Sequence, residues 1–89
     1  MSNETYLNHP TFGLLFRVCF LEEEKELFAS LYAQRLFFLV TTSTDGVRFE
    51  PITRSDARIL VDGQLRFFRR QAMLPEHHQL QLIRKQTFE

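Results

Sequence analysis

The sequence lacks several of the features that stabilise or activate a small protein. It has one cysteine, Cys19, no tryptophan, and only three glycines and three prolines in 89 residues. A single cysteine excludes an internal disulfide, which fits a reducing cytoplasm. No apolar run approaches the roughly 20 residues of a membrane-spanning helix, and no signal peptide is evident. We therefore expect a soluble cytoplasmic chain.

Net charge is also absent, because eleven basic and eleven acidic residues cancel. This balance argues against the basic surface that independent nucleic-acid binding requires. The two parts of the chain differ, however: residues 1–53 contain four basic and seven acidic residues, whereas residues 54–89 contain seven and four. The asymmetry indicates either two parts that face different partners or a basic helix exposed to solvent.

The hydrophobic pattern of the first half predicts strands, and ten phenylalanines provide the bulk of a small core. Residues 11–21 alternate Phe12, Leu14, Phe16, Val18 and Phe20 with a mixed opposite face, which is typical of a strand. Residues 6 and 7 fit a short strand before it. The tetrapeptide STDG, residues 43–46, predicts a hairpin turn, and VRFEPI predicts a last strand that ends at the proline.

The segment EEEKELFASLYAQRL, residues 22–36, has two interpretations. Its apolar spacing and its many helix-forming residues favour an amphipathic helix. The alternative is two strands joined tightly at Ala33 and Gln34, since one strand through the whole segment would be too long. Periodicity alone prefers the helix.

The last third predicts two helices. Thr53 is suited to cap the first, in which Ala57, Leu60, Val61, Leu65 and Phe68 form an apolar stripe. The second helix is expected from Pro75 to about Thr87, with a thin apolar stripe of Leu80, Ile83 and Phe88.

Residues that could form a catalytic or metal site are few. Cys19 lies in a strand pattern and is expected to pack as a small apolar group. His77 and His78 are adjacent, so on a helix they point apart and cannot hold one metal ion together. The sequence therefore predicts no enzyme and no cofactor.

The surface offers a better candidate. Tyr and Arg dominate binding hot spots, and Tyr32 and Arg35 lie close together beside Leu36 and Phe38. The alternative is that Tyr32 closes the core and Arg35 solubilises a turn. If RLFFLV is a strand, Leu36 and Phe38 share the binding face, and Phe37 and Leu39 point into the core.

Four segments, YLNHPTFGLLF, KELFASLYAQRLFFLV, RFEPI and KQTFE, resemble the cyanobacterial PII-interacting protein X (PipX) family over nearly the whole chain. The resemblance implies a mainly β fold of the α+β class, a Tudor-like five-stranded antiparallel barrel followed by two helices. Residues 1–53 would form the partner-binding barrel and residues 54–89 a two-helix appendage. This expectation replaces the helix over residues 22–36 by strands.

The resemblance also implies a function. Family members are adaptors, monomeric when free, that bind and coactivate the transcription factor NtcA when 2-oxoglutarate is abundant and are captured by the PII signalling protein when it is scarce. Both partners would use one barrel face, and the residues expected to form it are Glu4, Tyr6, Phe12, Tyr32, Gln34, Arg35, Leu36 and Phe38.

Two other functions remain open at this stage. One is a small barrel that associates with RNA or the ribosome, against which the neutral charge counts. The other is an RNA polymerase-binding module, in which the helices contact polymerase through Arg66, Arg69 and Arg70.

Overall fold

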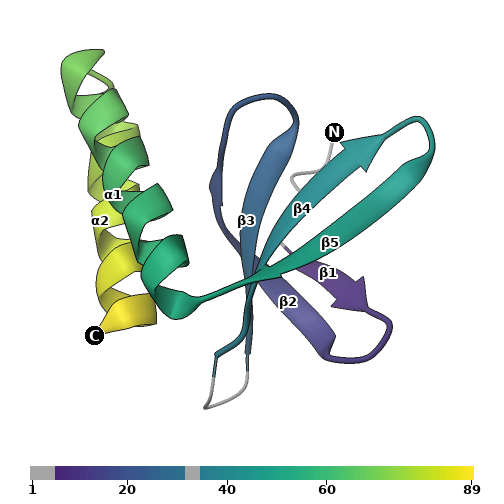
Figure 1. Ribbon diagram of the computed structural model, residues 1–89. Coiled ribbons are helices and arrows are strands. Elements are labelled where there is room, and N and C mark those ends of the chain that lie inside the picture. The colour runs from purple at the N-terminus through teal and green to yellow at the C-terminus, as the bar shows by residue number, and fades with distance from the viewer. Residues whose placement is uncertain (1–5, 32–34) are drawn as a thin grey trace. The chain divides into compact units, whose positions relative to one another are not determined.

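The computed structural model describes residues 6–31 and 35–89, and their contacts divide the chain into two compact units, Met1–Thr53 and Arg54–Glu89. The first unit contains five strands (Figure 1): β1 (Tyr6–His9), β2 (Gly13–Phe20), β3 (Lys25–Ser30), β4 (Phe37–Ser43) and β5 (Gly46–Ile52). The second contains two helices, α1 (Arg54–Arg70) and α2 (Leu74–Phe88). The predicted five antiparallel strands followed by two helices are therefore confirmed.

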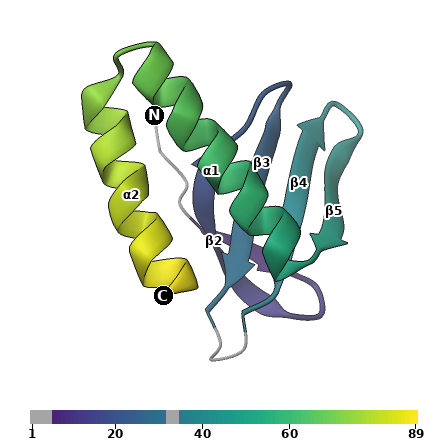
Figure 2. The ribbon, with the colours of Figure 1, turned by 60° about the vertical axis from the view of Figure 1, so that its left-hand side comes forward.

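The five strands form one curled sheet, a half-barrel (Figures 1 and 2). Each strand pairs antiparallel with the next, in the order β1-β2-β3-β4-β5, so β1 and β5 are the edge strands. This order places the β1–β2 turn and the β3–β4 connection at one end of the sheet, which we call the β3–β4 end. The β2–β3 and β4–β5 turns lie at the opposite end.

Strand β3 occupies the segment for which periodicity favours a helix, so that preference is wrong. Leu27, Phe28, Ala29 and Ser30 are all buried, which means that both faces of β3 are covered. A strand covered on both faces has no alternation of apolar and polar residues, so the sequence carries no period of two there. The predicted turn residues Ala33 and Gln34 lie outside the described residues.

The turns at the opposite end follow from local backbone chemistry. Ser43 faces Gly46 in the β4–β5 hairpin, as the STDG signal predicts, and Gly46 has a φ of 127° that suits glycine. The β2–β3 turn instead uses two residues with positive φ that are not glycine, Glu23 and Glu24. Strand β5 runs through Pro51 and ends one residue later than predicted, because an edge strand tolerates a missing N–H.

The core of the sheet unit is a cluster of Leu15, Phe28, Phe38 and Val40, against which Leu7 and Phe49 pack. Phe38 faces Phe28 across the β3–β4 pair and is only 2% exposed. The prediction that Phe38 shares an exposed binding face with Leu36 is therefore wrong. Phe37 is also buried, but on the face opposite the core cluster, so the expectation that Phe37 and Leu39 point into the core is wrong by one residue of register. The sequence FFLV is apolar at every position, so it does not indicate which alternate residues face the core.

Helix α1 begins directly after Thr53 and buries Ala57 and Val61 of the expected stripe. Helix α2 starts one residue before Pro75 and extends to Phe88. Two arginines cross-link the unit. Arg54 Nη2 donates to the Phe88 carbonyl at 2.7 Å, and Arg84 Nε donates to Asp62 Oδ1 at 2.7 Å. The first bond places a cation at the C-terminal end of α2, where it stabilises the helix dipole.

We predict that Phe38→Ala lowers the free energy of unfolding by about 3–5 kcal/mol, because it removes a buried aromatic ring from the core cluster. Phe20→Ala is the matched control, since Phe20 is 58% exposed at the end of β2 and should lose much less. Chemical denaturation of both variants measures the difference. Equal stability of the two variants would contradict the core position of Phe38.

Cys19 is buried in β2, directly after a register shift between Arg17 and Cys19 in the β2–β3 pairing. Burial disfavours the charged thiolate and raises the pKa of the Cys19 thiol from 9.0 to about 12. The thiolate is the reactive form, so this cysteine is inert near neutral pH.

We predict that a thiol reagent modifies folded protein at pH 8 at least about a thousandfold more slowly than protein unfolded in denaturant, since a pKa rise from 9.0 to about 12 lowers the thiolate fraction by that factor. Raising the pH over the range in which the protein stays folded should increase the rate, because the thiolate fraction rises with pH. Stopped-flow absorbance with a chromogenic disulfide measures both rates. Modification of the folded protein within the mixing time at pH 8 would show that Cys19 is accessible.

Candidate protein-interaction site

The predicted contact residues are only partly within the described chain. Glu4, Tyr32 and Gln34 lie outside the described residues. The structure places the others on β1, in the β1–β2 turn, directly before β4 and at its start; these are Tyr6, Phe12, Arg35, Leu36 and Phe38.

Arg35 and Tyr6 are brought together by Phe16. The guanidinium carbon of Arg35 lies 5.0 Å from the centroid of the Phe16 ring, a cation–π contact. Phe16 faces Tyr6 across the β1–β2 pair, so both rings project from the same face of the sheet. Leu14 lies two residues from Phe16 on β2 and shares that face. We call Tyr6, Leu14, Phe16 and Arg35 the Arg35 patch.

The Arg35 patch leaves a large part of its apolar surface in contact with solvent. Tyr6 is 52% exposed and Leu14 is 40% exposed, while Phe16 and Arg35 are half-buried. Adjacent exposed apolar groups are costly in water and commonly mark an interface. The patch also contains tyrosine and arginine, the residue types that contribute most to binding energy. Its composition therefore suits contact with a protein.

A hydrogen bond to Ser30 holds the Arg35 side chain in place. Its Nη1 donates to the main-chain carbonyl of Ser30 at 3.0 Å, and Ser30 itself is fully buried. The main-chain N–H of Leu36 donates to Ser30 Oγ at 2.9 Å, and the N–H of Ser30 donates to the Leu36 carbonyl at 2.9 Å. Leu36, which follows Arg35, is 41% exposed. The end of the β3–β4 connection is thus bonded to the last residue of β3.

Phe12 and Phe38 belong to a different cluster. The Phe12 ring centroid lies 5.0 Å from that of His9 and 5.7 Å from that of Phe38. His9 Nδ1 accepts hydrogen bonds from the main-chain N–H groups of Thr11 and Phe12, at 3.0 and 3.2 Å, and so holds the β1–β2 turn. Phe12 is therefore packed on the side of the core, whereas Tyr6 and Phe16 project from the opposite face.

Three residues of the site were not found from the sequence: Leu14, Phe16 and Ser30. The alternation that predicts β2 groups Leu14 and Phe16 with the apolar face of a strand and gives no sign that part of this face is exposed. Ser30 lies in the segment that resembles a helix, so its contact with Leu36 had no sequence signal. Because apolar and polar residues do not alternate along β3, the sequence did not indicate that Ser30 lies in a strand.

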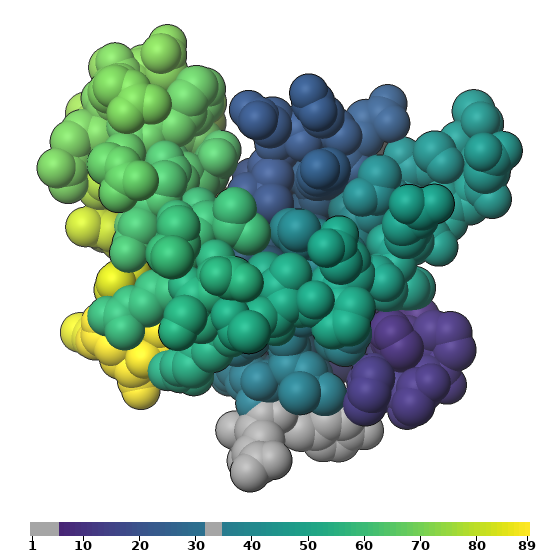
Figure 3. Space-filling model, in the orientation of Figure 1, coloured from purple at the N-terminus to yellow at the C-terminus, as the bar shows by residue number. Residues whose placement is uncertain are grey.

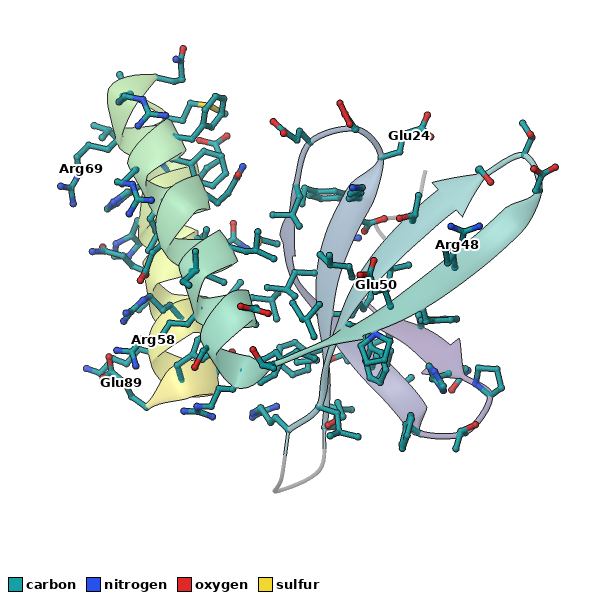
Figure 4. The ribbon with its side chains drawn as sticks, viewed as in Figure 1. Glu24, Arg48, Glu50, Arg58, Arg69 and Glu89 are labelled. Atoms are coloured by element: carbon teal, nitrogen blue, oxygen red, sulfur yellow. The ribbon has the colours of Figure 1, made fainter. Side chains whose placement is uncertain are left out.

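The predicted second contact region lies near the end of α1. Arg66, Arg69 and Arg70 are exposed, and no carboxylate within residues 6–31 and 35–89 forms an ion pair with them. Arg69 points outward from the helix in Figure 4, and the turn that follows α1 forms one end of the surface of the helical unit in Figure 3. Spacings of three and four place Arg66, Arg69 and Arg70 on one side of the helix.

The described residues contain no group of three or more His, Cys, Asp or Glu side chains that could hold a metal ion. None of the helices in this part of the chain combines the length and apolar character needed to cross a membrane.

Comparison with known proteins links the chain to one family. A family model described as PipX, PII-interacting protein X, matches residues 3–88. A search of curated proteins found no significant match. The family match covers both the sheet unit and the helical unit.

Proposed function

The chain belongs to the PII-interacting protein X family, and we propose that it is a non-enzymatic adaptor that binds the PII signalling protein and the transcription activator NtcA through one surface. That surface is the Arg35 patch together with Leu36. The family name supports PII as a partner, whereas NtcA comes from the resemblance of the sequence to the cyanobacterial members of the family.

The observation that carries this proposal is the Arg35 patch itself. It combines a restrained cation with exposed apolar groups on a rigid sheet. A restrained side chain loses less conformational entropy on binding than a mobile one, so more of its contact energy contributes to affinity. Exposed Leu31 and Leu36, which precede and follow residues 32–34, extend the apolar area at this end of the sheet.

One shared surface turns binding into a competition between two partners. If PII and NtcA both cover the Arg35 patch, a chain bound to PII is not available to NtcA. In this proposal 2-oxoglutarate decides the competition: the adaptor binds NtcA when 2-oxoglutarate is abundant and PII when it is scarce. Binding only the active conformation of NtcA shifts the population towards that conformation, which is sufficient for coactivation.

A second contact is favoured by Arg66, Arg69 and Arg70. Arg54 and Arg84 bond to groups within the helical unit, whereas Arg58 and these three are exposed and form no ion pair in the described part of the chain. Arg66, Arg69 and Arg70 differ from Arg58 in being clustered at the end of α1. We propose that they meet an acidic surface of RNA polymerase while NtcA holds the sheet unit. A nucleic-acid role is less favoured, because the chain has no net charge.

We predict that Arg35→Ala and Tyr6→Ala each weaken PII binding by about 2 kcal/mol, which is roughly thirtyfold, and weaken NtcA binding in parallel. Their melting temperatures should fall by less than that of Phe38→Ala, because neither side chain belongs to the core cluster, although Arg35→Ala also removes the hydrogen bond to the buried Ser30 carbonyl. Calorimetric titrations with PII and with NtcA, each with and without 2-oxoglutarate, measure the effect.

Arg48→Ala is the control for these titrations, since Arg48 is exposed on β5 near the opposite end of the sheet (Figure 4). Wild-type protein that binds neither partner would refute the adaptor function. Losses of melting temperature in proportion to the losses of affinity would instead show that Arg35 and Tyr6 only support the fold.

We predict that replacing Arg66, Arg69 and Arg70 by alanine reduces NtcA-dependent transcription by at least about threefold while NtcA affinity is retained, because the polymerase contact is lost separately. In vitro transcription beside a binding titration measures both quantities. Replacement by lysine, which keeps the charge, should retain more activity. An equal fall in transcription and NtcA affinity would argue against a separate polymerase contact.

A further inference from the structure

Ser30 and Leu36 depart from the usual hydrogen bonding of an antiparallel pair. Two residues in a hydrogen-bonded pair normally exchange both main-chain bonds, N–H to carbonyl in each direction. Here the first bond is regular, since Ser30 N donates to the Leu36 carbonyl at 2.9 Å. The second is not, because Leu36 N–H donates to the Ser30 hydroxyl at 2.9 Å instead of to the Ser30 carbonyl.

The Ser30 carbonyl, which does not bond to the Leu36 N–H, accepts a hydrogen bond from Arg35 instead. Its Nη1 donates to the Ser30 carbonyl at 3.0 Å. All three polar groups of Ser30, the main-chain N–H, the carbonyl and the hydroxyl, therefore bond to residues 35 and 36. Ser30 is fully buried, so none of these bonds competes directly with bulk water.

We infer that Ser30 is a positioning residue for binding: its hydroxyl takes the Leu36 N–H and so leaves its carbonyl free to orient the Arg35 guanidinium. The inference rests on the proposed function, in which the Arg35 patch contacts PII. Ser30 itself, being buried, does not touch the partner.

The orientation of Arg35 is fixed at two points. Nη1 of the guanidinium is bonded to Ser30, and its Cζ atom lies over the Phe16 ring, 5.0 Å from the centroid. Within residues 6–31 and 35–89, the other N–H donors of the guanidinium have no hydrogen-bond acceptor. Planar, restrained donors match a carboxylate better than a mobile ammonium does. The partner group that this geometry suits is therefore a carboxylate beside an apolar side chain, which would rest on Tyr6 and Leu14.

Removing the hydroxyl should undo this arrangement without removing the strand. In Ser30→Ala, the Leu36 N–H no longer has a side-chain acceptor and turns to the carbonyl at position 30, as in a regular pair. Arg35 then shares or loses its acceptor, and its side chain regains rotamer freedom. Binding must restrict that freedom again, so affinity falls even though Arg35 is still present.

The test is a double-mutant cycle in the full chain, with PII affinity measured by calorimetry for wild type, Ser30→Ala, Arg35→Ala and the double variant. Ser30→Ala should weaken binding by about fivefold, as expected for one lost hydrogen bond. In the Arg35→Ala background the same change should have no further effect on affinity. Equal weakening in both backgrounds, or no weakening in either, would overturn the inference.

Ser43→Ala is the matched control, because the Ser43 hydroxyl also accepts a main-chain N–H, that of Asp45 at 3.2 Å, at the opposite end of the sheet. It should leave PII affinity unchanged. A Ser43 variant that weakens binding as much as the Ser30 variant would overturn the inference, because the loss would then be unspecific.

A partner-free measurement separates this inference from the proposed function and does not depend on whether Ser30→Ala folds. Nitrogen-15 relaxation of the arginine Nε groups in free wild-type protein should show Arg35 more ordered than exposed Arg69. Arg35 as mobile as Arg69 would overturn the positioning role, whatever PII does. Ordered Arg35 in a protein that fails to bind PII would show that the side chain is restrained and would refute the proposed function instead.

Discussion

The three hydrogen bonds of Ser30 are the constraint on which the candidate site depends. The chain leaves the sheet after β3 and returns at β4, and Ser30 bonds the returning residues 35 and 36 to the strand it ends. Without such bonds, an exposed connection would sample many conformations, and its side chains would lose that freedom on binding. Because Ser30 is buried within the sheet, the position of Arg35 depends on the packing of the whole sheet unit.

That packing sets the register of β4 and so decides which residues reach the surface. Phe38 and Val40 join Leu15 and Phe28 in the core cluster, and a slip of one residue would reverse the faces of the strand. On β1 and β2 the same division puts Leu7 and Leu15 on the core side and Tyr6 and Phe16 on the opposite side. The core and the Arg35 patch are therefore two faces of one registered sheet.

The sequence predicts this structure where local signals are strong and fails where burial removes them. The alternation of β2 and the STDG turn suffice to place the first and last hairpins. Strand β3 could not be predicted from periodicity, because both of its faces are buried, and the family resemblance was needed to replace the helix. In the site, Tyr6, Arg35 and Leu36 were predicted, whereas Phe38 was assigned to the wrong face. The bond between Ser30 and Arg35 depends on strand register, which residue types alone do not encode.

In the proposed function, PII contacts the Arg35 patch at the β3–β4 end of the sheet. A methyl NMR titration of the labelled chain with unlabelled PII tests this contact most directly, because exposed leucine and valine methyl groups lie at both ends of the sheet. Leu14 and Leu36 should shift or broaden on binding, whereas Val47, equally exposed in the β4–β5 hairpin at the opposite end, should not. Perturbation of Val47 with Leu14 and Leu36 unchanged would contradict the claim.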